Sequence, residues 1–508
     1  IIIKGSINAD FPEFDTTAMT GFAHITGVNI QYQKKKYQLD TLKINATHAA
    51  DTQSLSLTTP FADAVLKGEY TFSNIGPAVT SVINKYLYKE TADIFFDPHV
   101  VARLNMNVHI PDSLAGIMGM TSIKPFIATG AINTDSAELA FAAVIPGMKY
   151  GTYIIDTVTI AANSDDTKHE SLSYVFKVNR ITAPSFILPE SVTGGKISKG
   201  IIDGRIALLD DDRETRYLLP YTITNDTLLP YLHIHDSLLI NKRKWAVNDS
   251  NIIYLSAEKL KGSQLTISNG EESFGIIAEG TEESGLPLTV RFDRFKLRNI
   301  SEIVVADSAL IKGETNGTFT ITSLSDFTFT SNLLVDSLVI KEVPAGDLAI
   351  KVNQQTEDKL SVDISLQGNG NDVTLKGTYN LAESKPALFL EMSPFNLEVA
   401  EPLASSYLAS LKGNILGSLN INGTLDKPAI IGALLLDSIK AVYRDYNTFI
   451  SIPSSGLSFE DGAINFSPLY FTDSAGNKGV ITGNVFTSDY RDYRFDLKMK
   501  ATNFTVVG

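Results

Sequence analysis

The chain has 508 residues, several times the length of an average domain, and contains no cysteine, so disulfides cannot stabilise it. Its 43 basic and 57 acidic residues give a net charge of −14, which argues against nucleic acid as a partner, because phosphate binding needs a basic surface. Hydrophobic residues make up 44 % of the chain, yet no run of about 18 apolar residues predicts a membrane-spanning helix. The apolar side chains must therefore be dispersed. Both ends of the chain are strand-like runs, and we expect flanking residues that include an N-terminal anchor.

Apolar and polar residues alternate along much of the chain, which predicts β-strands with one apolar and one wet face. Between residues 42 and 46, Leu42, Ile44 and Ala46 alternate with Lys43 and Asn45. The same pattern occurs at 104–110, at 172–178 and at 362–367. Such strands are typical of antiparallel sheets that are covered on one side only.

Helices are predicted in three short segments. One begins at Pro77 and carries apolar residues at helical spacing as far as residue 87. The second candidate is Ser113–Met120, which Gly116 and Gly119 interrupt, and the third begins at Pro402 and extends to residue 411. The rest of the chain reads as one continuous β architecture.

A strand phrase with the pattern Lys-Gly-x-x-x-Gly begins at Lys199, Lys312 and Lys412, which indicates stacked β units. A shorter phrase joins an aspartate to a serine or threonine and two alternating apolar residues, and we interpret it as a polar turn that opens a strand. It occurs at Asp40, Asp156, Asp236, Asp336 and Asp437. Tight turns are also predicted at Asn269-Gly270, Asn316-Gly317, 368–372 and Asp461-Gly462.

Candidate residues for chemistry are few. His233 and His235 lie on one face of a strand beside Asp236, but no third metal ligand is near in sequence, and a solvated strand face is the favoured interpretation. The three aspartates at 210–212 could bind calcium, but they lack the spacing of an EF-hand loop, and a turn explains them better. Trp245 could mark a membrane interface, although an ordinary strand residue is favoured. No motif of a hydrolase, metalloprotease or phosphate-binding loop occurs, so the sequence predicts no enzyme, no metal site and no cofactor.

One family resemblance emerges towards the C-terminus. Residues 417–432, GSLNINGTLDKPAIIG, follow the pattern G-x-L-x-I-x-G-T-L-x-x-P-x-I-x-G. Residues 473–483, DSAGNKGVITG, are followed by YRFDL at 493–497 and by NF at 503–504. The order of these motifs resembles the TamB branch of the AsmA-like family, and the strands around Trp245 are similar to the middle of such proteins. The resemblance covers approximately residues 190–508.

The resemblance implies an all-β fold, an elongated curled antiparallel sheet (a β-taco, or repeating β-groove) with a few short helices. It implies a repeated groove region at 1–410 and the start of a TamB-like C-terminal domain at 411–508, continuous with the groove. Such proteins lie in the periplasm of Gram-negative bacteria, anchored in the inner membrane and reaching an outer-membrane barrel of the BamA or TamA type. Their implied role is phospholipid transport between the membranes, and the alternative is assistance in outer-membrane protein assembly.

The alternation itself agrees with a lipid conduit, because strands that are apolar on one face only can cover that face with acyl chains. A scaffold that binds clients at strand edges is the second hypothesis, and an adhesin of separate β-sandwiches, which would need linkers, is the third. We predict that a set of alternating apolar residues lines the interior of the groove and that Asn105, Asn107, Thr320 and Asn420 face outward. The predicted lining residues are Leu104, Met106, Val108, Ile110, Tyr174, Phe176, Phe319, Ile321, Leu419, Ile421, Leu434 and Leu436.

Overall fold

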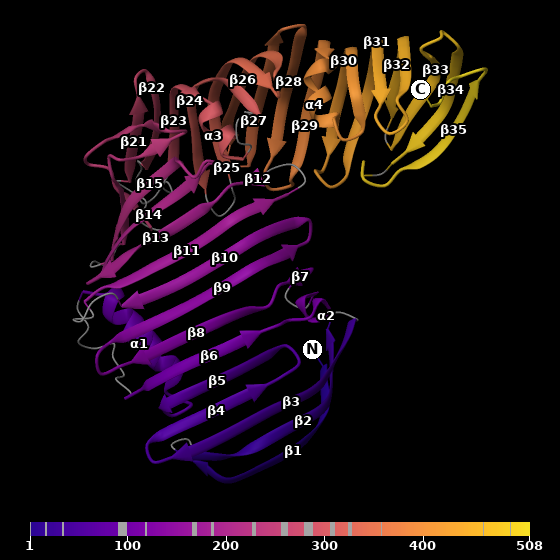
Figure 1. The fold of residues 1–508 in the computed structure, drawn as a ribbon. Coiled ribbons are helices and arrows are strands. Elements are labelled where there is room, and N and C mark those ends of the chain that lie inside the picture. Colours follow the sequence, from indigo (N-terminus) through magenta and orange to yellow (C-terminus); the bar gives the residue numbers. More distant parts are fainter. Residues whose placement is uncertain are drawn as a thin grey trace. The chain divides into compact units, whose positions relative to one another are not determined.

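The chain forms two compact units in the computed structural model (Figure 1). Unit 1 comprises Ile1–Leu260 with Ile303–Ala306, and unit 2 comprises Lys261–Glu302 with Asp307–Gly508. The structure describes residues 2–15, 18–32, 35–89, 99–116, 119–164, 170–183, 187–225, 230–255, 263–278, 288–304, 310–323, 328–356, 358–460, 462–487 and 489–507. None of the helices within these ranges is long and apolar enough to cross a membrane.

Unit 1 is built around one antiparallel sheet in which strands that follow one another along the chain are mostly neighbours. All strands of the unit except β19 belong to this sheet. The strands are β1 (Ile2–Asp15), β2 (Ala18–Tyr32), β3 (Lys35–Ala49), β4 (Thr52–Thr58), β5 (Ala62–Glu69), β6 (Val101–Val108), β7 (Ser122–Ile123), β8 (Phe126–Asn133), β9 (Glu138–Tyr150), β10 (Tyr153–Ser164), β11 (Leu172–Thr182), β12 (Ile187–Leu188), β13 (Ser191–Ser198), β14 (Ile201–Leu209), β15 (Thr215–Thr224), β16 (Tyr231–Ile234), β17 (Leu239–Ile240), β18 (Arg243–Lys244), β19 (Ala246–Val247) and β20 (Ile253–Tyr254).

In the described part of unit 1, helices α1 (Ile75–Leu87) and α2 (Asp112–Ala115) pack on the sheet. Helix α1 buries Ala78, Val82 and Tyr86 against strand residues, and the Tyr86 hydroxyl donates a hydrogen bond to the carbonyl oxygen of Ala137 at 2.6 Å. The short helix α2 follows β6. The helix predicted from Pro77 is therefore confirmed, and its apolar stripe packs against the sheet.

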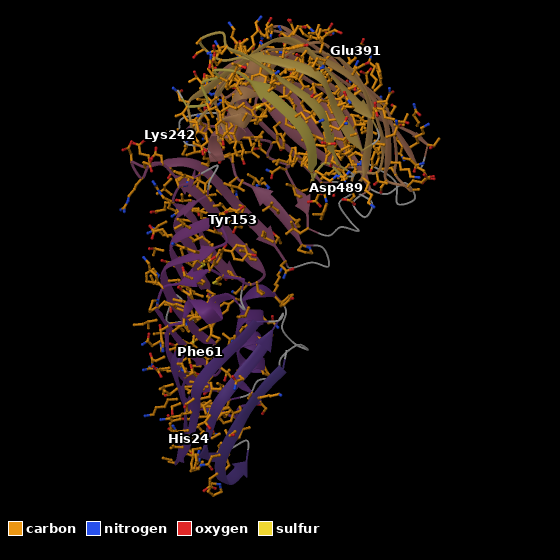
Figure 2. The ribbon with its side chains drawn as sticks, turned by 90° about the vertical axis from the view of Figure 1, so that its right-hand side faces the viewer. His24, Phe61, Tyr153, Lys242, Glu391 and Asp489 are labelled. Atoms are coloured by element: carbon orange, nitrogen blue, oxygen red, sulfur yellow. The ribbon has the colours of Figure 1, made fainter. Side chains whose placement is uncertain are left out.

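Unit 2 is a second antiparallel sheet, in which β21–β35 pair in chain order. Its strands are β21 (Gln264–Asn269), β22 (Glu272–Ala278), β23 (Leu288–Lys296), β24 (Ile311–Ser323), β25 (Thr328–Ile340), β26 (Val343–Thr356), β27 (Lys359–Gly368), β28 (Asn371–Asn380), β29 (Lys385–Asn396), β30 (Leu408–Gly423), β31 (Pro428–Tyr443), β32 (Thr448–Glu460), β33 (Ala463–Thr472), β34 (Lys478–Phe486) and β35 (Arg494–Ala501). The described helical segments of this part of the chain are α3 (Arg298–Val304), whose last two residues belong to unit 1, η4 (Leu397–Val399) and α4 (Glu401–Ala404). Figure 2 shows that this sheet curls, with Glu391 on its convex side.

The all-β class with curled antiparallel sheets and few helices is as predicted, but the expectation of one continuous sheet is wrong, because the strands divide into two sheets. The division between the two units lies near residue 260. Residue 411, where the C-terminal domain was predicted to begin without a break in the groove, lies within β30, which pairs with β29 and β31, and that domain assignment stays a prediction. The helix predicted from Pro402 is also wrong beyond Ala404, because Leu408 begins the long strand β30. Strand pairing there overrides the helical spacing of the apolar residues.

The aspartate-serine phrase forms a bulge within a strand at two places in unit 2, which corrects the prediction of a turn. Lys312 pairs with Val339 and Glu314 with Asp336, so β25 holds one more residue than β24 between these pairs. The extra residue lies at Ser337, whose φ is 52°. The same bulge occurs in β31, where Ser438 has a φ of 55°. Bulges increase local twist and bend a strand, which suits a curled sheet.

The Lys-Gly-x-x-x-Gly phrase has two different structures. The copies at Lys312 and Lys412 lie inside β24 and β30, opposite the bulges, so the turn predicted at Asn316-Gly317 is also wrong. Gly317 needs to be glycine because its φ is 116° and a Cβ there would lie 2.0 Å from the carbonyl oxygen of Asn332. The copy at Lys199 instead forms the turn between β13 and β14. The three copies are therefore not equivalent.

Candidate functional site

Directly paired residues of an antiparallel sheet point to the same side, so the registers show which side chains share a face. In unit 1, two neighbouring rows of such residues cross the sheet without a charged side chain. The Leu104 row consists of Leu55, Leu66, Leu104, Gly130, Phe141, Ala162, Tyr174, Gly195, Gly204 and Tyr221. The Met106 row consists of Leu57, Ala64, Met106, Ala128, Ala143, Ile160, Phe176, Thr193, Ile206 and Leu219.

The predicted lining residues of unit 1 mostly share this apolar face. Leu104 and Met106 are partly buried, Val108 is buried on the same side of β6, and Tyr174 and Phe176 belong to the same two rows. Phe176 is 46 % exposed, so nothing in the described part of the chain covers it fully. Asn105 and Asn107, which alternate with these residues, are exposed as predicted.

Ile110 differs from the other predicted lining residues because it lies beyond the end of β6. It packs against Val28 and Leu114, close to helix α2. Helix α1 lies at the opposite ends of these strands, where it covers Ala102, Ile132 and their neighbours. Both helices therefore pack on the apolar face, and the Leu104 and Met106 rows run between them.

Unit 2 repeats the arrangement with mainly aliphatic residues. The Leu419 row consists of Leu333, Ile350, Ile364, Leu375, Leu390 and Leu419. The Leu434 row consists of Val335, Leu348, Leu366, Val373, Met392, Gly417, Leu434, Leu457 and Phe466. None of these side chains carries a charge or a hydrogen-bonding group.

The registers assign all six predicted lining residues of unit 2 to this face. Phe319 and Ile421 belong to one row through Ser331, Val352 and Leu388, and Ile321 lies two residues from Phe319 on the same strand. Leu419 is 7 % exposed, and Leu436 pairs with Ile415 one step beyond Leu434. The shared face is observed; that these residues line a path for lipid stays a prediction.

The opposite face of unit 2 is largely polar. Lys351 pairs with Asp363, and Asp363 pairs with Lys376, whose ammonium lies 3.9 Å from the carboxylate. Asn420 is exposed on this face as predicted. Large apolar side chains also point to this side, among them Phe389, Ile431 and Leu435, which are 40 %, 48 % and 42 % exposed. Strand β31 is therefore apolar on both faces, unlike most of its neighbours.

A pair of tyrosines interrupts the apolar face of unit 1. The hydroxyl oxygens of Tyr174 and Tyr221 lie 2.9 Å apart and share a hydrogen bond. Gly195 and Gly204 lie between the two tyrosines in the Leu104 row, and a Cβ at Gly204 would lie 2.5 Å from the Tyr174 hydroxyl oxygen. Burial and the hydrogen bond with the Tyr221 hydroxyl raise the pKa of Tyr174 well above its usual range, so the Tyr174 phenol is neutral. Tyr221 was not among the residues predicted from the sequence, where its only signal is the pair of glycines, Gly195 and Gly204, between two tyrosines.

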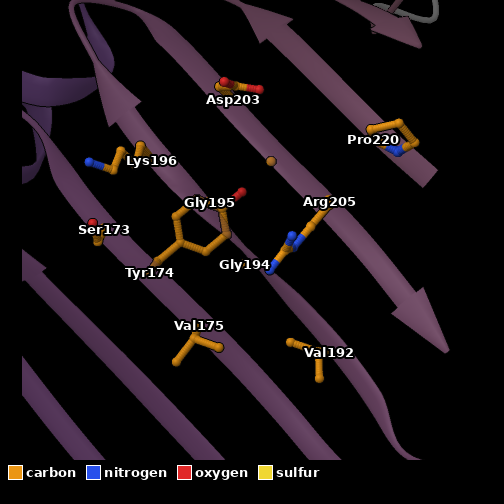
Figure 3. A pocket seen from close by; sticks show the side chains of 11 residues that line it. Ser173, Tyr174, Val175, Val192, Gly194, Gly195, Lys196, Asp203, Arg205 and Pro220 are labelled. Carbon is orange, nitrogen blue, oxygen red and sulfur yellow. The ribbon is translucent and has the colours of Figure 1, made fainter. Parts of the chain in front are cut away.

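An open pocket of about 510 Å³ lies over β11, β13, β14 and β15 in the same region (Figure 3). Ser173, Val175 and Lys196 line it together with Arg205. These side chains alternate along their strands with the residues of the Leu104 row, so they point away from the apolar face. The pocket therefore belongs to the polar side of the sheet.

The candidate metal ligands have ordinary partners. The Nδ1 atom of His233 lies 2.8 Å from the carbonyl oxygen of Asn251, and the Nε2 atom of His235 lies 2.7 Å from the Thr222 hydroxyl oxygen. Asp210 accepts hydrogen bonds from the backbone amides of Asp212 and Glu214, which confirms a turn between β14 and β15. Among the described residues, no three His, Cys, Asp or Glu side chains are grouped closely enough to hold a metal ion.

Trp245 is fully buried, which contradicts the membrane-interface interpretation. It lies between β18 and β19 rather than within a strand, so the favoured interpretation as a strand residue is not exact either. Its backbone amide donates a hydrogen bond to the Leu238 carbonyl oxygen, and the Arg243 guanidinium lies 6.0 Å from the ring.

Comparison with known proteins gave no match: no family model matches the chain, and no curated protein or solved structure is significantly similar to it.

Proposed function

We propose that the chain holds phospholipid acyl chains against its two apolar faces and conducts lipid between the inner and outer membranes of a Gram-negative envelope. The observation that carries the proposal is the uncharged rows, which cross β4–β15 in unit 1 and β25–β30 in unit 2. In this proposal the protein works in the periplasm, anchored in the inner membrane and meeting a BamA- or TamA-like barrel at the outer membrane, as the family resemblance implies.

Apolar rows suit an acyl chain for an energetic reason. Each methylene group that leaves water is stabilised by about 0.8 kcal/mol, so a chain of many methylenes would bind firmly. The side chains of the Leu419 and Leu434 rows offer no hydrogen-bonding partner, so one position along these rows resembles the next. A bound chain could therefore move from strand to strand at little cost, which a conduit requires.

The second candidate is a scaffold that assists outer-membrane protein assembly. The exposed apolar side chains Phe389, Ile431 and Leu435 support it, because they lie on the polar face, where a lipid lane gives them no role. The conduit needs the apolar face of β31, which carries Leu434, whereas the scaffold needs the opposite face, which carries Leu435.

Mass spectrometry of lipids that co-purify with the protein under mild conditions tests the conduit. We expect diacyl lipid in stoichiometric amounts with the wild-type protein, and a large loss of it from Leu434→Arg, which places a charge on the apolar face. The matched variant Leu435→Arg changes the neighbouring leucine on the opposite face and should retain the lipid. If a folded wild-type protein carries no lipid, or both variants retain it equally, the conduit proposal fails.

A further inference from the structure

The tyrosine pair of unit 1 is a polar feature on a face that is otherwise almost without hydrogen-bonding groups. In the described parts of the Leu104 and Met106 rows, the side chains that can form hydrogen bonds are those of Tyr174, Tyr221 and Thr193. The neighbouring residues Phe176 and Ile206 are apolar and are 46 % and 39 % exposed. The two hydroxyls therefore lie within an apolar surround.

The glycines explain why the hydroxyls meet. Each phenol ring reaches towards the other across positions where Gly195 and Gly204 provide no side chain. A Cβ at Gly204 would also lie 2.9 Å from the Tyr221 hydroxyl oxygen, so any larger residue would separate the pair. The absence of side chains at Gly195 and Gly204 therefore leaves room for the two hydroxyls in the middle of the sheet.

The pair has unused hydrogen-bonding capacity. A hydroxyl can donate one hydrogen bond and accept two, and one tyrosine donates to the other across the 2.9 Å contact. The tyrosine that accepts therefore keeps its own proton, which it can donate to a third group. Within the described residues, neither hydroxyl has a further hydrogen-bond acceptor, and Tyr174 is only partly buried.

We infer that the Tyr174–Tyr221 pair is a hydrogen-bonding site for a carbonyl oxygen at the polar end of an acyl chain, either the ester of a lipid or the acid of a free fatty acid. The inference rests on the proposed function, because it requires the methylenes of that chain to lie along the Leu104 and Met106 rows. A carbonyl oxygen accepts and cannot donate, so it complements the free hydroxyl proton. The site would give unit 1 a fixed position for one end of the chain, which the rows of unit 2 do not offer.

The test compares two fluorescent probes, pyrenedodecane and methyl pyrenedodecanoate, which differ in the ester group. We expect Tyr174→Phe together with Tyr221→Phe to weaken binding of the ester about 2- to 10-fold, the loss of one net hydrogen bond, and to leave binding of the alkane unchanged. Tyr150→Phe removes a phenol hydroxyl that is outside both rows and should change neither. Competition with oleic acid and with dioleoyl phosphatidylcholine then distinguishes the free acid from the lipid ester.

The outcomes separate this inference from the proposed function. If the wild-type protein binds neither probe, the apolar faces do not hold acyl chains, and both fall. If it binds both probes and the double variant weakens them equally, or weakens neither, the hydroxyl site is wrong while the conduit proposal stands.

Discussion

The two units share one design and differ in what lies on the apolar face. In unit 1, helix α1 covers one end of the strands and the tyrosine pair interrupts the Leu104 row. In unit 2, the Leu419 row is entirely aliphatic, and the cluster around Val399 of η4 covers residues near the bulges. The uncharged rows are common to both units, whereas the glycine phrase is not. The feature that both units repeat is therefore an apolar face crossed by uncharged rows, and not a sequence motif.

The largest expected effect separates the two faces of one strand of unit 2. Leu434→Arg should abolish lipid transport, because an unpaired ion in an apolar surround costs several kcal/mol and blocks a sliding chain. Because Leu434 is only partly buried, water can reach the new charge and the sheet should stay folded. The measurement is outer-membrane permeability of a deletion strain that expresses the variant. Leu435→Arg, on the opposite face, should restore the barrier; a reversed result would favour the scaffold.

A second expected effect is confined to unit 1. Tyr86→Ala should destabilise this unit by about 3–5 kcal/mol, because it empties the contact between α1 and the sheet. Trp245 is the only tryptophan and lies in unit 1, so its fluorescence reports the unfolding of that unit. The control Tyr88→Ala, at a tyrosine that is 38 % exposed, should stay within about 0.5 kcal/mol of wild type. Equal effects of the two substitutions would contradict the packing of α1.

A third substitution should destabilise unit 2 without affecting unit 1. Gly317→Ala forces a side chain into a φ of 116° and against the Asn332 carbonyl oxygen, which should cost about 1–3 kcal/mol. Circular dichroism in urea should show an earlier transition, while the Trp245 fluorescence transition stays in place. Gly456→Ala is the matched control, since a Cβ there meets nothing within 4 Å. A shift of the Trp245 transition by Gly317→Ala would mean that the units do not unfold separately.

The smallest effect concerns pH in unit 1. The His99 ring lies 3.0 Å from an Asp135 oxygen and 3.1 Å from a Glu69 oxygen, and hydrogen bonds to Asp135 and then Glu69 raise the pKa of His99. A raised pKa in the folded state stabilises the protein fully below the unfolded pKa of about 6.5, and this contribution is lost as the pH rises through the folded value. The residues are exposed, so the effect should be small. Asp135→Asn should flatten the dependence of the Trp245 unfolding transition on pH. If this dependence is unchanged, His99 does not contribute to the stability of unit 1 in this way.

The sequence predicted which side chains share a face of the sheet better than it predicted the turns and the division into two sheets. Alternation at Leu104 and Leu419 identified the apolar side correctly, because a strand allows only two directions for a side chain. The same alternation could not distinguish one sheet from two, since a break between sheets leaves the period unchanged. Local motifs were the weakest guide: Asn316-Gly317 suggests a turn, yet it lies within β24, where strand pairing determines the backbone. Tyr221 was missed because its partner is 47 residues away in sequence.

Photo-crosslinking in living cells shows whether acyl chains occupy the apolar faces. A crosslinking amino acid would replace Met106 or Leu434 on the apolar faces, and Asn107 or Leu435 on the opposite faces. The account predicts lipid adducts at Met106 and Leu434 and none at Asn107 and Leu435. Equal labelling of both faces, or protein adducts alone at Leu435, would contradict it.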